Sequence, residues 1–172
     1  MKEADLTPKW YPFYTRSRFE KKVYESLIKA GYEAFLPLKK TERFWSDRKK
    51  IVEVPLINSY VFVKAAKFQL YDIVRINGVV RYVSFNNQPA TIRDSEIELI
   101  KSALSAKTEI DVLDGCFTEG AEVHITSGVF KGYVGKVTEF KGKSKIVLAI
   151  ESVNKTLMVT VDVGSLTEPK VG

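Results

Sequence analysis

The chain contains 172 residues, of which 45% are hydrophobic, and its net charge is +6 at pH 7. This length and composition predict a folded protein of one or two small domains and exclude a disordered chain. The single cysteine, Cys116, excludes an intrachain disulfide, and with His124 as the single histidine the chain cannot assemble a Cys/His zinc cluster. No apolar run approaches ~18 residues and no charged-then-apolar leader is present, so we expect a cytoplasmic protein without membrane span, metal or cofactor.

The charge is unevenly distributed along the chain. Residues 1–107 contain 20 Lys and Arg against 12 Asp and Glu, a net charge of +8. Residues 108–172 contain 7 against 9, a net charge of −2. We therefore expect the N-terminal part to meet a polyanion and the C-terminal part to meet protein.

Residues 1–107 carry the pattern of a two-layer α+β domain. Apolar residues recur at helical spacing over 18–30, and Gly31 follows where a left-handed C-cap would end the helix. Asp94 is a favourable N-cap for a second long helix. The predicted elements are strands at 9–15, 33–40, 50–54, 59–64 and 79–85, helices at 18–30, 67–74 and 94–107, and a solvated loop at 41–49. This order predicts a mainly antiparallel sheet with helices on one face, a ferredoxin-like α/β sandwich.

The C-terminal part carries only strand patterns. Residues 108–116 are polar and acidic without periodicity, which predicts a linker. Beyond the linker, strands are predicted at 122–126, 133–140, 144–150, 156–161 and 165–167, with turns at Gly128, Gly142, Asn154 and Gly164. Five short strands predict a small five-stranded, SH3-like β-barrel over residues 117–172.

A basic loop that leads into an aromatic strand is the most informative stretch of the sequence. Residues 59–64 alternate, so if Val61 and Val63 face a core, Tyr60 and Phe62 point to the opposite face of the sheet. Two large rings on that face need cover from either a helix or a partner. We expect a binding surface here.

Two resemblances meet in this chain. The N-terminal part resembles the NGN domain of the NusG family of transcription elongation factors in Trp10-Tyr11, the helix near Arg18, Phe35-Leu36-Pro37 and the strands at 60–63 and 78–83. The C-terminal part resembles a KOW domain at residues 120–137. NGN followed by KOW identifies the chain as a member of this family. The compact NGN domain and the basic loop at 39–50 are similar to specialised paralogues such as RfaH and the antiterminators of capsular polysaccharide operons.

The resemblance implies that the NGN domain binds the clamp helices of the largest RNA polymerase subunit and suppresses pausing or termination. It places Tyr14, Tyr60, Phe62 and Phe85 in the apolar pocket for these helices. Rings suit this role because they bury a large, rigid surface with little loss of rotamer entropy. The alternative for each ring is that it fills the core.

Two groups of basic residues are candidates for contacts with non-template DNA or nascent RNA. Arg16, Lys22 and Lys29 lie at the end of the first strand and on the first helix, and their alternative is a solvated polar face. The second group combines charge with a stacking surface, as in single-strand binding, and its alternative is a solvated hairpin. It comprises Lys39, Lys40, Arg43, Trp45, Arg48, Lys49 and Lys50.

Phe130 lies in the turn between the first two barrel strands, where the family contacts a small-subunit ribosomal protein or the terminator Rho. It is either an exposed binding tip or a cap on the barrel core. Gly128, Gly132 and Gly135 are expected to meet backbone requirements. Residues 69–72 depart from the hydroxyl-rich pattern that the specialised relatives present to the second-largest polymerase subunit.

An enzyme is not expected, because the sequence lacks a Walker loop, Gly-x-Gly-x-x-Gly, Gly-x-Ser-x-Gly and a metal-ligand cluster. The nearer alternative is a general RNA-binding or ribosome-associated KOW protein. The elongation-factor hypothesis requires polymerase binding through the face of Tyr60 and Phe62, whereas the alternative requires structured RNA alone. A monomer is expected for a two-domain factor that lies along polymerase.

Overall fold

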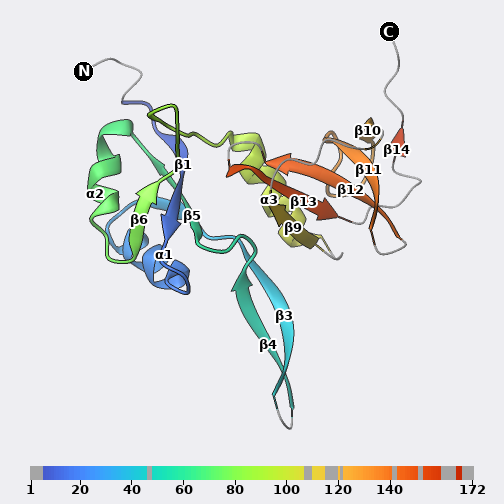
Figure 1. Cartoon of the computed structure of the whole chain (residues 1–172), viewed down its shortest axis with the longest axis horizontal. Coiled ribbons are helices and arrows are strands. Elements are labelled where there is room, and N and C mark those ends of the chain that lie inside the picture. Colours follow the sequence, from blue (N-terminus) through green and yellow to red (C-terminus); the bar gives the residue numbers. More distant parts are fainter. Residues whose placement is uncertain are drawn as a thin grey trace. The chain divides into compact units, whose positions relative to one another are not determined.

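The structure is a computed structural model that describes residues 6–45, 48–106, 110–114, 120, 122–140, 143–150, 153–159 and 166–167. The chain divides into two compact units, residues 1–94 and 95–172. Figure 1 shows helices and strands in the first unit and a strand-rich second unit. Cys116 lies outside the described residues.

The first unit is built on a four-stranded antiparallel sheet with the strand order β2-β5-β1-β6. The two central strands are rich in aromatic and β-branched residues, which suit the half-buried surface of a sheet. The strands are β1 (Lys9–Thr15), β2 (Glu33–Phe35), β5 (Tyr60–Ala65) and β6 (Val79–Tyr82). Every predicted strand that enters this sheet is present, with shorter bounds for β2 and β6.

Helices cover one face of this sheet. They are α1 (Glu20–Lys29) and α2 (Leu70–Val74), the second preceded by the 3-10 turn η2 (Lys67–Gln69). Alternate strand residues and the inner helix faces share one core. Its members are Tyr11, Phe13, Val23, Leu27, Leu36, Val61, Val63, Ala65, Leu70, Ile73 and Val79. The predicted α+β sandwich is confirmed.

Two hairpins complete the first unit. The long hairpin pairs β3 (Leu38–Trp45) with β4 (Arg48–Pro55) and extends away from the four-stranded sheet (Figure 1). The prediction of a solvated loop at 41–49 is therefore wrong, because most of these residues form main-chain pairs. The short hairpin pairs β7 (Ser84–Phe85) with β8 (Gln88–Pro89) through two asparagines with positive φ, as a type I′ turn requires.

The second unit contains α3 (Asp94–Ser105), which begins at the boundary residue, and a six-stranded antiparallel sheet with the order β14-β10-β11-β12-β13-β9. The strands are β9 (Ile110–Asp114), β10 (Glu122–Ile125), β11 (Val134–Phe140), β12 (Lys143–Ile150), β13 (Lys155–Val159) and β14 (Leu166–Thr167). The five predicted strands are present. The sixth, β9, occupies most of the stretch predicted to be a linker, because it pairs with β13 over five residues.

Candidate functional site

The face of the four-stranded sheet opposite α1 and α2 carries a group of rings, which we call the aromatic face. The strand register places Tyr14 opposite Tyr60 and Phe35 opposite Phe62, and Trp10 lies on the same face of β1 two pleats from Tyr14. Three strands therefore contribute to it. Its members are Trp10, Tyr14, Phe35, Tyr60 and Phe62.

The rings of this face contact one another in pairs. The Tyr60 hydroxyl donates a hydrogen bond to the Tyr14 hydroxyl at 2.6 Å, with ring centroids 4.6 Å apart. Phe35 stacks on Phe62 with centroids 6.2 Å apart. The Arg81 guanidinium of β6 lies 5.1 Å from the centre of the Tyr14 ring, within cation–π range. The pairs give the face a fixed arrangement with a cation at one border.

Two of the predicted site rings are buried in this structure. Tyr60 is 5% exposed and Phe62 is 0% exposed, whereas Tyr14 is half-buried. The sequence predicted that these rings need cover, and they have it. A partner that binds here therefore reaches Tyr60 and Phe62 only after they become exposed.

Phe85, the fourth predicted ring, is not part of the aromatic face. It lies in the short β7–β8 hairpin, and its side chain is exposed. Among the described residues, no ring pair joins it to Tyr14, Tyr60 or Phe62. The structure thus brings together three of the four predicted rings.

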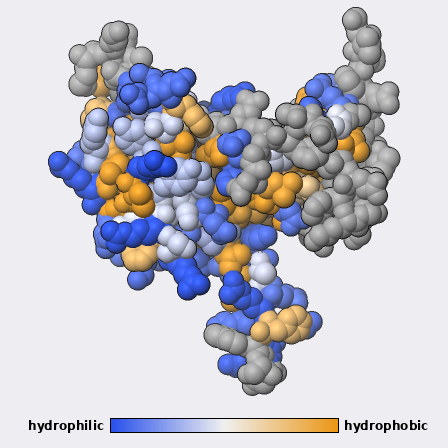
Figure 2. Space-filling view, in the orientation of Figure 1, coloured by the Kyte–Doolittle hydropathy of each residue, from blue (hydrophilic) through white to orange (hydrophobic). Residues whose placement is uncertain are grey.

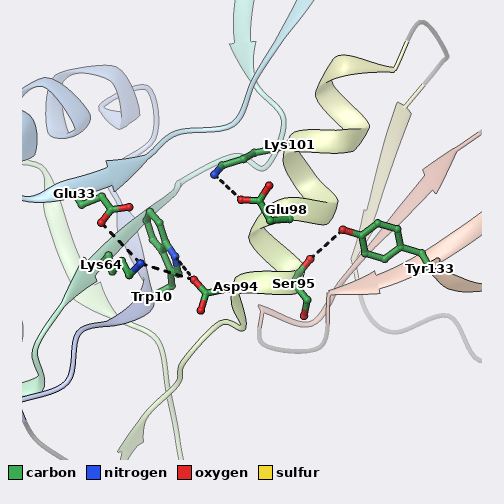
Figure 3. A network of polar contacts seen from close by, with 8 residues as sticks. All are labelled: Trp10, Glu33, Lys64, Asp94, Ser95, Glu98, Lys101 and Tyr133. Atoms are coloured by element: carbon green, nitrogen blue, oxygen red, sulfur yellow. Dashed lines mark hydrogen bonds and ion pairs between the residues drawn. The ribbon is translucent and has the colours of Figure 1, made fainter. Parts of the chain in front are cut away.

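Trp10, Phe35 and Arg81 were not predicted to belong to the site. Sequence alternation within one strand does not tell which residues of other strands share its face, because that depends on pairing register. Trp10 also anchors a polar network, in which its indole N–H donates to the Asp94 carboxylate at 3.1 Å (Figure 3). The Lys64 ammonium lies 4.0 Å from both the Asp94 and the Glu33 carboxylates. This network holds one end of the face.

A buried carboxylate positions the start of β5. Glu20, in the first turn of α1, accepts a hydrogen bond from the Ser59 backbone N–H at 2.9 Å, and its side chain is buried. Ser59 has φ +61°, a left-handed conformation that costs a non-glycine residue free energy. The Glu20 contact stabilises this bend immediately before Tyr60.

Of the first group of predicted nucleic-acid contacts, two residues lie beside the same aromatic ring. Arg16 and Lys22 are exposed and lie 5.9 and 5.3 Å from the centre of the Phe19 ring, so the two cations share one aromatic neighbour. Lys29 is exposed in the last turn of α1, where a cation complements the helix dipole.

The second group lies along the β3–β4 hairpin. Lys39 is half-buried near the base, and the other described cations, Lys40, Arg43, Arg48, Lys49 and Lys50, are exposed. The Lys49 ammonium lies 3.8 Å from the Glu42 carboxylate and 5.1 Å from the centre of the Phe44 ring. Figure 2 shows hydrophilic surface interrupted by hydrophobic side chains on this hairpin. Trp45 closes β3, and its side chain lies outside the described part of the molecule.

The turn before β11 resolves the two alternatives for Phe130. Its ring is 3% exposed, so it caps the core, and the neighbouring Val129 is the exposed apolar residue of the turn. Gly128 and Gly132 have φ +76° and +90°, as expected for backbone requirements. Gly135 is needed for a different reason, which is close packing, because a Cβ atom there would lie 2.5 Å from Ile146 Cγ2.

Tyr71 and Tyr82 meet on the helical side of the first unit. Burial raises the pKa of Tyr82 above its ordinary value of 10.0, and the charge of Tyr71 and a hydrogen bond with Tyr71 raise it further. Tyr71 itself is exposed on α2, within the stretch that departs from the hydroxyl-rich pattern.

Within the described ranges, no three His, Cys, Asp or Glu side chains lie close enough to hold a metal ion. None of the described helices has the length and apolar character needed to cross a membrane.

Comparison with known proteins decides the family. The model of the family described as transcription termination factor nusG matches residues 8–101, more than half of the chain. The chain belongs to the NusG family. The NusG family comprises transcription elongation and antitermination factors that are not enzymes, so the expectation of a non-enzymatic protein is confirmed.

Individual relatives extend the similarity across both units. The transcription termination/antitermination protein NusG of Thermus thermophilus is 26% identical over 167 residues, which cover 84% of this chain and 91% of the relative. The protein of the same name from Chlamydia trachomatis is 28% identical over 159 residues, which cover 83% and 85%. A solved structure on domain interaction in Thermotoga maritima NusG superposes with a TM-score of 0.59 at 23% identity and covers 94% of this chain and 97% of that one. This last similarity confirms the fold, an NGN-like sheet with helices followed by a KOW-like sheet.

Proposed function

We propose that this NusG-family protein binds RNA polymerase through the aromatic face and suppresses pausing or termination during elongation. The observation that carries the proposal is the meeting of Tyr14, Tyr60 and Phe62 on one sheet face. These are three of the four rings that the family resemblance implies for the pocket of the polymerase clamp helices. A helix pair that packs on this face would bury rigid rings, the residue type that dominates interface energies.

Accessibility sets the order of contact at this face. Tyr14 is half-buried and Arg81 is exposed, so a partner meets these two side chains first. Tyr60 and Phe62 join the interface when they become exposed. Truncation of Tyr14 is therefore a more direct probe than truncation of Phe62, whose loss would leave a cavity in a packed region.

The test is a pull-down of the full chain by an immobilised fragment that carries the clamp helices. Tyr14→Ala is compared with Phe68→Ala, which truncates an exposed ring on η2, in the helical layer. We expect Tyr14→Ala to weaken binding about ten-fold or more and Phe68→Ala to leave it unchanged. Equal effects would contradict the role of the aromatic face. If the parent chain does not bind, the alternative of a general RNA-binding or ribosome-associated KOW protein is favoured.

Nucleic acid is the second partner in this proposal. Non-template DNA or nascent RNA contacts the β3–β4 hairpin, and Arg16, Lys22 and Lys29 extend the basic surface at α1. All of these cations except the half-buried Lys39 are exposed, which supports the proposal because exposed Lys and Arg contact phosphates without first losing a buried environment. The basic hairpin also supports a specialised role similar to RfaH in long operons, such as those for capsular polysaccharides. Run-off transcription with purified polymerase on such a template, with and without the protein, tests that role.

The KOW-like sheet recruits a further protein, a small-subunit ribosomal protein or Rho, through the turn that carries Val129. Phe130 supports this turn from the core and is not itself the contact. Val129→Ser is expected to weaken such binding without loss of stability, whereas Phe130→Ala should destabilise the sheet by about 3–5 kcal/mol. Binding of the ribosomal protein and of Rho is measured for the parent and for Val129→Ser. The partner is the protein that binds the parent and binds Val129→Ser more weakly.

Residues 1–107 form the polymerase-binding domain in this proposal, and residues 117–172 form the KOW domain, whose sheet also takes in β9 from the stretch 108–116. The family match supports the first boundary, since it continues past residue 94 to residue 101. A factor of this kind acts as a monomer in the cytoplasm, where transcription takes place. Analytical ultracentrifugation of the full chain measures its molecular mass in solution and so tests whether it is a monomer.

A further inference from the structure

The β3–β4 hairpin has two chemically different faces. In an antiparallel pair, residues directly opposite each other lie on the same face, and successive pairs alternate between the faces. The register pairs Arg43 with Lys50 and, on the other face, Glu42 with Ile51. The register thus assigns every position of the hairpin to one of two sets. One set is positions 39, 41, 43, 45, 48, 50, 52 and 54, and the other is positions 38, 40, 42, 44, 49, 51, 53 and 55.

Cations occur in both of these sets, but the acidic residues of the paired positions all fall in one of them. The first set contains four cations and no acidic residue, and we call it the cationic face; its cations are Lys39, Arg43, Arg48 and Lys50. The second set contains two lysines and two glutamates, and we call it the balanced face; its charged residues are Lys40, Glu42, Lys49 and Glu53. The two faces therefore differ by four charges although they belong to the same hairpin.

On the balanced face, each lysine has a glutamate nearby. Lys49 forms an ion pair with Glu42 and lies over the Phe44 ring. Lys40 stands opposite Glu53 in the register. The exposed apolar side chains are also here, with Phe44 76% and Ile51 66% exposed. The net charge of this face is zero, so it does not attract a polyanion.

The cationic face carries charges of one sign only. Arg43 and Lys50 stand directly across from each other, an arrangement of like charges that destabilises a strand pair. Arg48 lies two residues from Lys50, roughly 7 Å along the strand. The outer side chains Arg43, Arg48 and Lys50 are exposed. A ligand with closely spaced negative charges would relieve the repulsion between these cations.

We infer that the cationic face alone of the β3–β4 hairpin binds the phosphate backbone of nucleic acid, while the balanced face makes no phosphate contact. The inference rests on the proposed function, because it specifies how the hairpin of a polymerase-bound factor meets nucleic acid. It divides the basic residues of the hairpin into contacts, Lys39, Arg43, Arg48 and Lys50, and non-contacts, Lys40 and Lys49. Overall charge alone would treat all six alike.

Two double variants of the full chain test this division. Arg43→Gln with Lys50→Gln removes two cations from the cationic face, and Lys40→Gln with Lys49→Gln removes two cations from the balanced face. Both lower the net charge by the same amount, so long-range electrostatic attraction falls equally. The first variant also removes a cross-strand repulsion, so its hairpin is not expected to unfold. Circular dichroism and urea denaturation check the fold of both.

The probes are labelled oligonucleotides of one mixed sequence, prepared as duplex DNA, single-stranded DNA and single-stranded RNA. Binding is titrated over a range of salt concentrations. Loss of two phosphate contacts lowers the slope of log K against log salt by about 1.8 for a duplex and about 1.4 for a single strand. We expect this change and about ten-fold or more weaker binding for the cationic-face variant on the preferred probe. The balanced-face variant is expected to keep the parental slope.

Equal changes in the two variants would overturn the inference, as would unchanged binding by the cationic-face variant or no binding of the parent to any probe at low salt. Polymerase binding is measured on the same three proteins. If polymerase binding is absent and the difference between the faces persists, the proposed function fails and this inference stands. If all three proteins bind polymerase but the two hairpin variants bind nucleic acid equally, this inference fails and the proposed function stands.

Discussion

Tyr14 and Tyr60 stand directly opposite each other on β1 and β5, with their hydroxyl oxygens 2.6 Å apart. The pair joins the two central strands through side chains as well as through the main chain. It also lies at the centre of the proposed polymerase contact, with Arg81 over the Tyr14 ring. Its hydroxyls and its rings can be tested separately.

Tyr60→Phe removes one hydroxyl and keeps the ring. The hydrogen bond is lost and the Tyr14 hydroxyl loses its partner, so we expect the free energy of unfolding to fall by about 0.5–1.5 kcal/mol. Tyr14→Phe should have a similar effect, and the double variant should cost less than the sum of the two. Urea denaturation measures all three. Full additivity would show that the hydroxyls do not interact.

Gly78→Ala tests the packing of the loop before β6 on α1. Gly78 has φ +97°, and a Cβ atom there would lie 2.8 Å from Phe19 Cδ1 and from Val23 Cγ2. We expect the free energy of unfolding of Gly78→Ala to fall for two reasons that add together, namely backbone strain of about 1–2 kcal/mol and overpacking of about 1–3 kcal/mol. Gly31→Ala is the matched control, because Gly31 has φ +84° and no atom within 4 Å of the added Cβ. Equal thermal stabilities of the two variants would contradict the predicted overpacking.

Glu20→Ala tests the bend before β5. The Ser59 N–H would lose its acceptor in a partly buried place, so we expect the free energy of unfolding to fall by about 1–3 kcal/mol. Glu20→Gln keeps an acceptor oxygen and should cost less. Denaturation of both variants in parallel separates the hydrogen bond from packing of the side chain. A loss for Glu20→Gln as large as that for Glu20→Ala would argue against the hydrogen bond.

Tyr82 makes stability depend on pH at the alkaline end. Burial is the larger cause that raises the pKa of Tyr82 above 10.0, and the interaction with Tyr71 is the smaller one. The folded state therefore holds the hydroxyl proton of Tyr82 more tightly than the unfolded state. The contribution is fully present below the unfolded pKa and is lost as pH rises through the folded pKa. In Tyr71→Phe the pKa of Tyr82 should fall but stay above 10.0, because burial remains. An NMR titration of the Tyr82 ring measures this, and an unchanged pKa would contradict the role of Tyr71.

The helices and the four sheet strands of the first unit could be predicted because their patterns are local. The helical spacing around Val23 and Leu27 and the turn at Asn86 and Asn87 depend on neighbours within a few residues. Strand β9 could not be found this way, since it depends on pairing with β13 about 45 residues away. Its polar and acidic sequence resembles a linker until that pairing is known.

The candidate site was predicted only in part for the same reason. Alternation in β5 identified Tyr60 and Phe62 as neighbours on one face, but Trp10, Phe35 and Arg81 join them through registers between strands. Phe85 lies outside the aromatic face because β6 ends at Tyr82 and a separate hairpin follows. The division of the hairpin cations into two faces likewise required its register.

The most direct test of the central claim is the affinity of RNA polymerase for Arg81→Glu and Arg75→Glu, measured by titration with the full chain. Both variants reverse one exposed arginine, but Arg81 borders the aromatic face and Arg75 follows α2, where it forms an exposed ion pair with Asp72. An exposed ion pair contributes little to stability, so the control should fold normally. We predict that Arg81→Glu weakens polymerase binding about ten-fold or more and that Arg75→Glu binds as the parent does. Parental binding by Arg81→Glu, or equal weakening by both, would contradict the aromatic face as the polymerase contact.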